Sequence, residues 1–222
     1  MSVRSRVALG ICGIVLTALL MLWAVAVYHV NALVPEAPSK VLEMGERADL
    51  GVNYFDSTYD LAPGYKLAVE KARIMTAREY LIGAGVSSSD IKGEEMTESS
   101  GADVLVVTLV IANEGTASAE DGTSEVGVSL SRYTIVGADK SKDYQLDEEL
   151  LGLAYPELAG DTAFALKPGS TYEMDVPFFL SGSPAYLETY DRQHRDPIEG
   201  NEFAMLIANS PERIFLKFAA ER

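Results

Sequence analysis

The sequence predicts a mainly β protein, an antiparallel β-sandwich with one or two short helices that follows a single N-terminal transmembrane helix. Three observations indicate this. A run of 24 residues without a charged side chain, residues 7–30, stands near the start of the 222-residue chain. After it come short β-branched and apolar segments separated by Gly, Pro and Asn, as in sandwich folds. One tetrapeptide, TARE at residues 76–79, has the pattern of a helix N-terminus.

Residues 7–30 are long enough to cross a membrane, because a spanning helix needs roughly 20 apolar residues. Trp23 and Tyr28 fall near the far end of the run, where amphipathic rings settle at the headgroup level. A cleaved secretory signal is the competing interpretation, since residues 24–26 (AVA) and 30–32 (VNA) both resemble a cleavage site. The apolar core of such a signal has only about 7–15 residues. The longer run therefore favours an uncleaved signal anchor, although cleavage stays open.

Basic residues orient this span. Arg4 and Arg6 precede it, and the first basic residue after it is Lys40. Because cytoplasmic flanks carry the excess of Lys and Arg, we expect a single-pass protein of the cell membrane. Its N-terminus (residues 1–6) is then cytoplasmic, the lipid bilayer surrounds residues 7–30, and the C-terminal part is extracellular.

The part beyond the span is strongly acidic. It holds all 33 acidic residues and all but two of the 18 basic ones, which leaves a net charge of about −17. Nucleic acid is therefore not an expected partner, since binding to it needs clustered Lys and Arg. The only cysteine, Cys12, lies in the span, so the outer part has no disulfide.

Residues 31–40, NALVPEAPSK, contain two prolines and predict a short stalk. Residues 41–222 show neither an internal repeat nor a second linker, which predicts one extracytoplasmic domain.

Residues 65–82 permit two interpretations, one long amphipathic helix or a strand followed by a short helix. Thr76 with Glu79 three residues later forms a capping box, which marks a helix start near Ala77. We therefore expect a strand over residues 65–74, with Tyr65, Leu67 and Val69 facing inward, and a helix that ends near Ile82.

The remaining strands follow from apolar runs between turns. Residues 104–112, VLVVTLVIA, predict a central strand that is buried on both faces. Residues 126–136 alternate, which places Val126, Val128, Leu130, Thr134 and Val136 on one face. Two hairpins are expected: residues 162–166 with 171–180 around KPGS, and residues 203–208 with 213–218 around NSP. The expected core includes Val106 or Val107, Leu109, Phe178 and Phe215.

Several of these segments resemble a family. "GYKLAVEKA" and "EYL" near residues 64–81, "VLVVTLVIANEG" at 104–115 and "LKPGSTYEMDVPFFL" at 166–180 are similar to segments of uncharacterised membrane-anchored extracytoplasmic proteins of Gram-positive bacteria. A shared feature is the Pro-aromatic pair Pro177-Phe178. The resemblance covers most of residues 41–219 and implies an immunoglobulin-like or telokin-like β-sandwich. It implies no activity and no functional residues.

Candidate catalytic and metal-binding residues are sparse. His194 lies near Asp191 and Asp196, but the flanking arginines favour an exposed loop residue over an acid–base or metal site. Acidic clusters at residues 147–149 and 120–125 lack the ligand spacing of a calcium loop. We expect no catalytic site, no cofactor and no metal, and hence not an enzyme.

One long connection, residues 183–201, contains Tyr186, Tyr190, Arg192 and Arg195. Tyrosine and arginine are enriched at recognition surfaces, although the tyrosines would also suit the end of a sandwich. The resulting hypothesis is a membrane-anchored extracytoplasmic binding or structural module of the cell envelope, which meets another envelope protein through this segment. The alternative is a ligand-sensing or enzymatic extracytoplasmic domain with an acidic site.

Overall fold

The computed structural model describes residues 3–33, 37–56, 61–89, 91, 103–115, 127–138, 142–180, 198 and 200–222. Within the first helix, side chains are described at residue 13 and at residues 15–30. The chain divides into two compact units, Met1–Glu36 and Ala37–Arg222.

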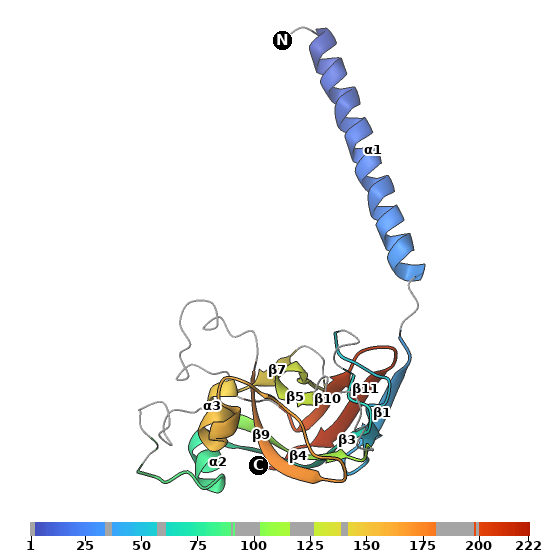
Figure 1. Cartoon of the computed structure of the whole chain (residues 1–222). Coiled ribbons are helices and arrows are strands. Elements are labelled where there is room, and N and C mark those ends of the chain that lie inside the picture. The colour runs from blue at the N-terminus through green and yellow to red at the C-terminus, as the bar shows by residue number, and fades with distance from the viewer. Residues whose placement is uncertain are drawn as a thin grey trace. The chain divides into compact units, whose positions relative to one another are not determined.

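The first unit consists of helix α1, Val3–Leu33, which runs without interruption for 31 residues (Figure 1). Its large apolar side chains are exposed, for example Leu22 at 72% and Trp23 at 67%. Among the described residues, no helix is both long and apolar enough to cross a membrane. Helix α1 ends at Leu33 and the first strand begins at Ser39, so both elements enter the segment predicted as a stalk.

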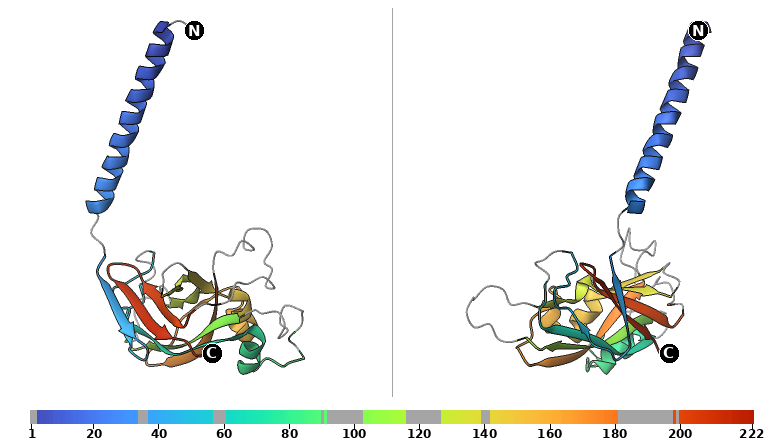
Figure 2. Two further views of the ribbon diagram at one scale, coloured as in Figure 1. Left: turned by 180° about the vertical axis from the view of Figure 1, so that it is seen from behind. Right: turned by 90° about the vertical axis from the view of Figure 1, so that its right-hand side faces the viewer.

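The second unit is built on one mixed sheet (Figures 1 and 2). Its nine strands lie in the order β1-β11-β10-β6-β7-β9-β4-β3-β2. Their bounds are β1 Ser39–Glu43, β2 Ala48–Asp49, β3 Tyr65–Thr76, β4 Asp103–Asn113, β6 Thr134–Gly137, β7 Asp143–Leu146, β9 Thr171–Leu180, β10 Glu202–Ala208 and β11 Arg213–Ala219. Two short strands, β5 Val128–Ser129 and β8 Ala163–Phe164, pair separately. The mainly β class with few helices is thus confirmed.

The sheet is not purely antiparallel, because β1 pairs with β11 in parallel, from Ser39 opposite Arg213 to Glu43 opposite Lys217. The sheet also curls until strands from its two halves meet. Just beyond β11, the Glu221 N–H donates to Ala72 O at 3.0 Å and Glu221 O accepts from the Ile74 N–H at 2.7 Å. The curl encloses the main hydrophobic core, to which β3, β4, β9, β10 and β11 all contribute.

The strand followed by a helix is the correct interpretation of residues 65–82. Strand β3 runs to Thr76, and α2 spans Ala77–Gly83. Thr76 Oγ1 accepts from the Glu79 N–H at 3.2 Å, and Glu79 Oε2 accepts from the Thr76 N–H at 2.9 Å, which completes the capping box. Tyr65, Leu67 and Val69 are buried, as predicted.

Strand β4 is central and buried on both faces, as its sequence predicts. It pairs with β3 on one side and β9 on the other. Val107 and Leu109 face the main core, whereas Val104 and Val106 pack into a second cluster with residues of α2 and α3. Helix α3, Glu148–Ala154, lies beside α2 over this outer face (Figure 1). Phe178 of β9 is also fully buried.

Besides the purely antiparallel sheet, three further sequence expectations fail. Residues 128–136 are not one alternating strand, because the 3-10 helix η4, Leu130–Arg132, interrupts them. After this helix the odd-numbered residues Tyr133 and Ile135 are the buried ones, in place of the expected even-numbered residues. Thr134 and Val136 are therefore only half-buried, and Val126 lies outside the described residues.

The expected hairpin around residues 167–170 also does not form, because the two strands that flank the turn do not pair with each other. The turn itself forms, since the Ser170 N–H donates to Lys167 O at 3.0 Å. Its flanking strands pair elsewhere, β8 with β5 and β9 with β4 and β7. The hairpin of β10 with β11 does form. Phe215 faces the opposite side of β11 from Ile214 and Leu216 and is only half-buried, so it is not a core residue.

Candidate functional site

The residues proposed from sequence as a partner-binding surface, Tyr186, Tyr190, Arg192 and Arg195, lie outside the described residues, as do His194 and residues 120–125. The acidic residues 147–149 are described, and they begin helix α3. Two pockets in the described part of the second unit have volumes of about 450 and 510 Å³ and are lined by several charged side chains.

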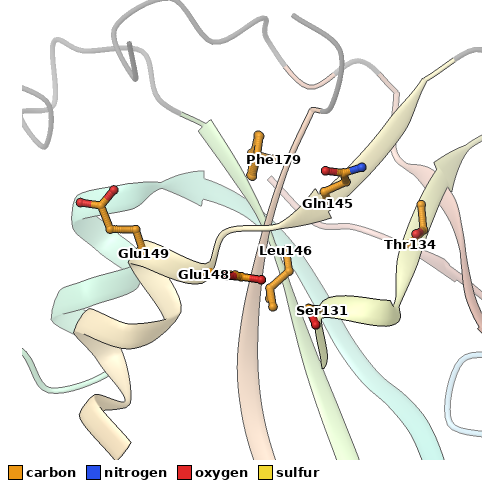
Figure 3. Close-up of a pocket in the computed structure, with 7 residues that line it drawn as sticks. All are labelled: Ser131, Thr134, Gln145, Leu146, Glu148, Glu149 and Phe179. Atoms are coloured by element: carbon orange, nitrogen blue, oxygen red, sulfur yellow. The ribbon is translucent and has the colours of Figure 1, made fainter. Parts of the chain in front are cut away.

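The first pocket, which we call the Glu148 pocket, has a volume of about 450 Å³. It lies where α3, η4 and strands β6, β7 and β9 come together. Its lining comprises Ser131, Thr134, Gln145, Leu146, Glu148, Glu149 and Phe179 (Figure 3). Figure 3 shows Glu148 close to Leu146 and Ser131, while Glu149 points away from this group.

Asp147 positions the two glutamates of this pocket. Its buried side chain caps α3 by accepting from the Leu150 N–H at 3.1 Å. Its own N–H donates to Pro177 O of β9 at 2.9 Å. The cap fixes the first turn of α3 against the sheet, so Glu148 and Glu149 project from a defined position. Carboxylate, hydroxyl and amide groups together can hydrogen-bond a polar or cationic ligand.

The second pocket, which we call the Arg73 pocket, has a volume of about 510 Å³. Strand β3 supplies Arg73, Ile74 and Met75, and α2 supplies Glu79, Tyr80 and Gly83. Asp175 comes from β9, and Glu221 and Arg222 follow β11. The bonds between β3 and the segment after β11 bring these last two residues to the pocket.

Asp175 is the centre of the polar network in this pocket. Its carboxylate accepts from Arg73 Nη2 at 2.6 Å and from the Thr108 hydroxyl at 2.5 Å. Its backbone carbonyl accepts from the Tyr80 hydroxyl at 3.1 Å, and its N–H donates to the Tyr155 hydroxyl at the same distance. Side chains from β3, β4 and α2, and Tyr155 at the end of α3, thus all bind this one residue of β9.

Burial raises the pKa of Tyr80 far above its usual value, and nearby Tyr155 and Asp175 act in the same direction. Burial likewise raises the pKa of Tyr155. Both phenols therefore stay protonated at any physiological pH, and each keeps its hydroxyl proton for hydrogen bonding.

The sequence analysis did not identify Arg73, Tyr80 or Asp175. A signal was present at the partner of Asp175, because Thr108 is the single polar residue within the apolar run of residues 104–112. A polar residue at such a position needs a hydrogen-bond partner when it is buried. Within the described residues, no group of three or more His, Cys, Asp or Glu is placed to hold a metal ion.

Comparison with known proteins identifies the family but not an activity. No curated protein and no solved structure matches the chain. The model of one family, described as "Domain of unknown function (DUF5028)", matches residues 39–214, that is, nearly all of the β unit. The expected resemblance to an uncharacterised family is confirmed to this extent. The chain belongs to the DUF5028 family.

Proposed function

We propose that this chain is a membrane-anchored extracytoplasmic module of the cell envelope, which binds another envelope protein or has a structural role. Residues 1–6 are cytoplasmic in this proposal, residues 7–30 cross the bilayer, and the β unit is displayed outside. The Gram-positive envelope suggested by the family resemblance is part of the same proposal.

The observation that carries the proposal is the surface of α1. Large apolar side chains are exposed along its described length, including Leu16, Leu19, Leu22 and Trp23. A helix that is apolar on all sides requires an apolar surrounding, either a protein core or a membrane. The described side chains, at residues 13 and 15–30, cover only part of the uncharged run, and the sequence supplies the rest of the apolar length. Arg4 and Arg6 at its start favour the proposed orientation.

We also propose that the β unit is an immunoglobulin-like sandwich. If the seven longer strands from β3 to β11 are lettered A to G in chain order, their order in the sheet is G-F-C-D-E-B-A. A constant-type immunoglobulin domain has the sheets CFG and ABED. The pairing of β6 with β7 joins the two halves into one continuous sheet. Such sandwiches present loops and edge strands to partners, but the fold alone assigns no activity.

Cysteine labelling on intact cells tests the topology. In a Cys12→Ser background, the substitution Val52→Cys places a thiol at a site where the native side chain is 73% exposed. The matched control is Ser2→Cys, before the span. A membrane-impermeant maleimide should label the first variant on intact cells and the control only after the membrane is permeabilised.

Two outcomes contradict the proposal. Labelling of Ser2→Cys but not Val52→Cys on intact cells would mean the reverse orientation. An intact mass showing that the mature protein begins near Ala26 or Ala32 would mean a cleaved signal rather than an anchor.

A further inference from the structure

We propose that the Arg73 pocket binds a small organic anion, through a carboxylate or phosphate group held by Arg73 and Arg222. None of the residues that line this site belongs to the proposed membrane anchor. The inference follows from which charged groups of the pocket are already engaged by the protein and which are not.

The carboxylates of the pocket each have a protein partner. Glu79 accepts from the N–H and the hydroxyl of Thr76 at 2.9 and 3.0 Å. Asp175 binds Arg73 and Thr108, as described above. Glu221 pairs with Lys71 at 3.3 Å. A cationic ligand would therefore have to compete with existing bonds at every acidic group.

The two guanidinium groups retain unused donors. A guanidinium has five N–H donors. Arg73 uses Nη2 toward Asp175, which leaves Nη1 without a bond among the described residues, while its unpartnered Nε is buried away from a ligand. Arg222 uses Nη2 toward Ile198 O. Since arginine forks match the geometry of carboxylate and phosphate oxygens, the unmet hydrogen-bonding capacity of the pocket favours an anion.

The rest of the lining indicates an anion with an apolar part. Ile74, Met75 and Tyr80 line the same pocket. A volume of about 510 Å³ falls in the range of small-molecule sites, roughly 300–1,000 Å³. The ligand class is thus a small aryl or alkyl carboxylate or phosphate monoester.

Three carboxylates line the pocket beside the two guanidinium groups, but each is already paired with a protein donor. The remaining acidic charge of the outer part acts on the ligand from farther away. At physiological ionic strength the screening length is about 8 Å, so donors in direct contact with the ligand dominate its binding. Binding should therefore depend on these two arginines and not on other basic residues of the domain.

The test uses the full chain in lipid nanodiscs, with benzoate, phenyl phosphate and inorganic phosphate as probes. Binding is followed by titration calorimetry and by the amide shift of Gly83, which lines the pocket. Arg222→Gln leaves the Arg73–Asp175 pair intact and is the main variant, with Arg73→Gln as the second. Arg213→Gln, at an exposed residue outside the pocket lining, removes the same charge and is the matched control.

We expect saturable binding of benzoate or phenyl phosphate that weakens at least tenfold in Arg222→Gln and stays unchanged in Arg213→Gln. A preference for one aromatic probe identifies its anionic group as the one that the pocket recognises. Equally tight binding of inorganic phosphate would contradict the proposed apolar part of the ligand. Absence of saturable binding by all three probes overturns the inference. Equal weakening in Arg222→Gln and Arg213→Gln also overturns it, because the effect would then be one of net charge.

Discussion

Replacement of Thr76 by alanine should destabilise the β unit. The Thr76 hydroxyl accepts from the Glu79 N–H at 3.2 Å and donates to Glu79 Oε2 at 3.0 Å. Loss of a Ser or Thr N-cap reduces stability by about 1 kcal/mol, within a range of roughly 0.5–2 kcal/mol. Thr76→Ser and Thr76→Asp keep an acceptor oxygen and should be nearly neutral.

The effect should reach beyond the cap because α2 covers part of the sheet. Tyr80 and Leu81 of this helix are buried against Val104 and Val106 of β4. A seven-residue helix has little stability of its own, so its packing depends on a correctly formed first turn.

The loss should also depend on pH. Hydrogen bonds from the backbone and side chain of Thr76 lower the pKa of Glu79 below its ordinary value. A carboxylate with a lowered pKa in the folded state stabilises the fold above its unfolded pKa, and this contribution disappears as the pH falls through the folded pKa. The difference between wild type and Thr76→Ala should therefore be smaller at pH 3 than at pH 7.

Urea unfolding followed by far-UV circular dichroism measures these differences, because the single tryptophan of the chain, Trp23, lies in α1 and not in the β unit. Thr171→Ala is the control: this threonine begins β9 at an exposed position, and such a surface change is expected to stay within about 0.5 kcal/mol. If Thr76→Ala instead stabilised the protein, position 76 would behave as a helix interior, where alanine is the better residue, and the cap would be refuted.

Two further predictions concern the core and the partner surface. Phe178→Ala should destabilise the β unit by about 3–5 kcal/mol because the ring is fully buried. Phe215→Ala, at a half-buried ring, should have a clearly smaller effect. Equal urea midpoints for the two variants would contradict this difference. Tyr190→Ala should reduce the recovery of a cross-linked envelope partner from intact cells without a change in unfolding midpoint, whereas unchanged recovery would exclude this tyrosine from the binding surface.

Local signals in the sequence were sufficient for several elements. The boundary between β3 and α2 follows from one capping box, since its hydrogen bonds join residues three apart. The two-sided burial of β4 follows from an apolar run without alternation, and the β10–β11 pair follows from a short turn between two apolar segments. The bonds of the cap and of the β10–β11 turn join residues a few positions apart, and the apolar composition of β4 by itself indicates that both of its faces are buried.

Strand partners and the face of Phe215 depended on distant residues. The turn at residues 167–170 formed without joining its neighbours, because the Gly169 N–H donates to Asn113 O at 2.7 Å and aligns β9 with β4 instead. The 3-10 turn of η4 changed which of the alternating residues after it face the core. Hydrophobic periodicity predicts neither the strand partners nor the 3-10 turn, since it shows which residues alternate and not which strand lies beside them.

The sequence by itself determined the acidic charge of the outer part, the uncharged N-terminal run, the mainly β composition and the cap at Thr76. Only the tertiary structure decided the candidate sites. Arg73 and Asp175 are 102 positions apart, and Arg222 reaches the same pocket because the curled sheet bonds the segment after β11 to β3. A pocket of this kind depends on the register of strands across the whole domain, and that register is set by the packing of the complete core and not by any one segment.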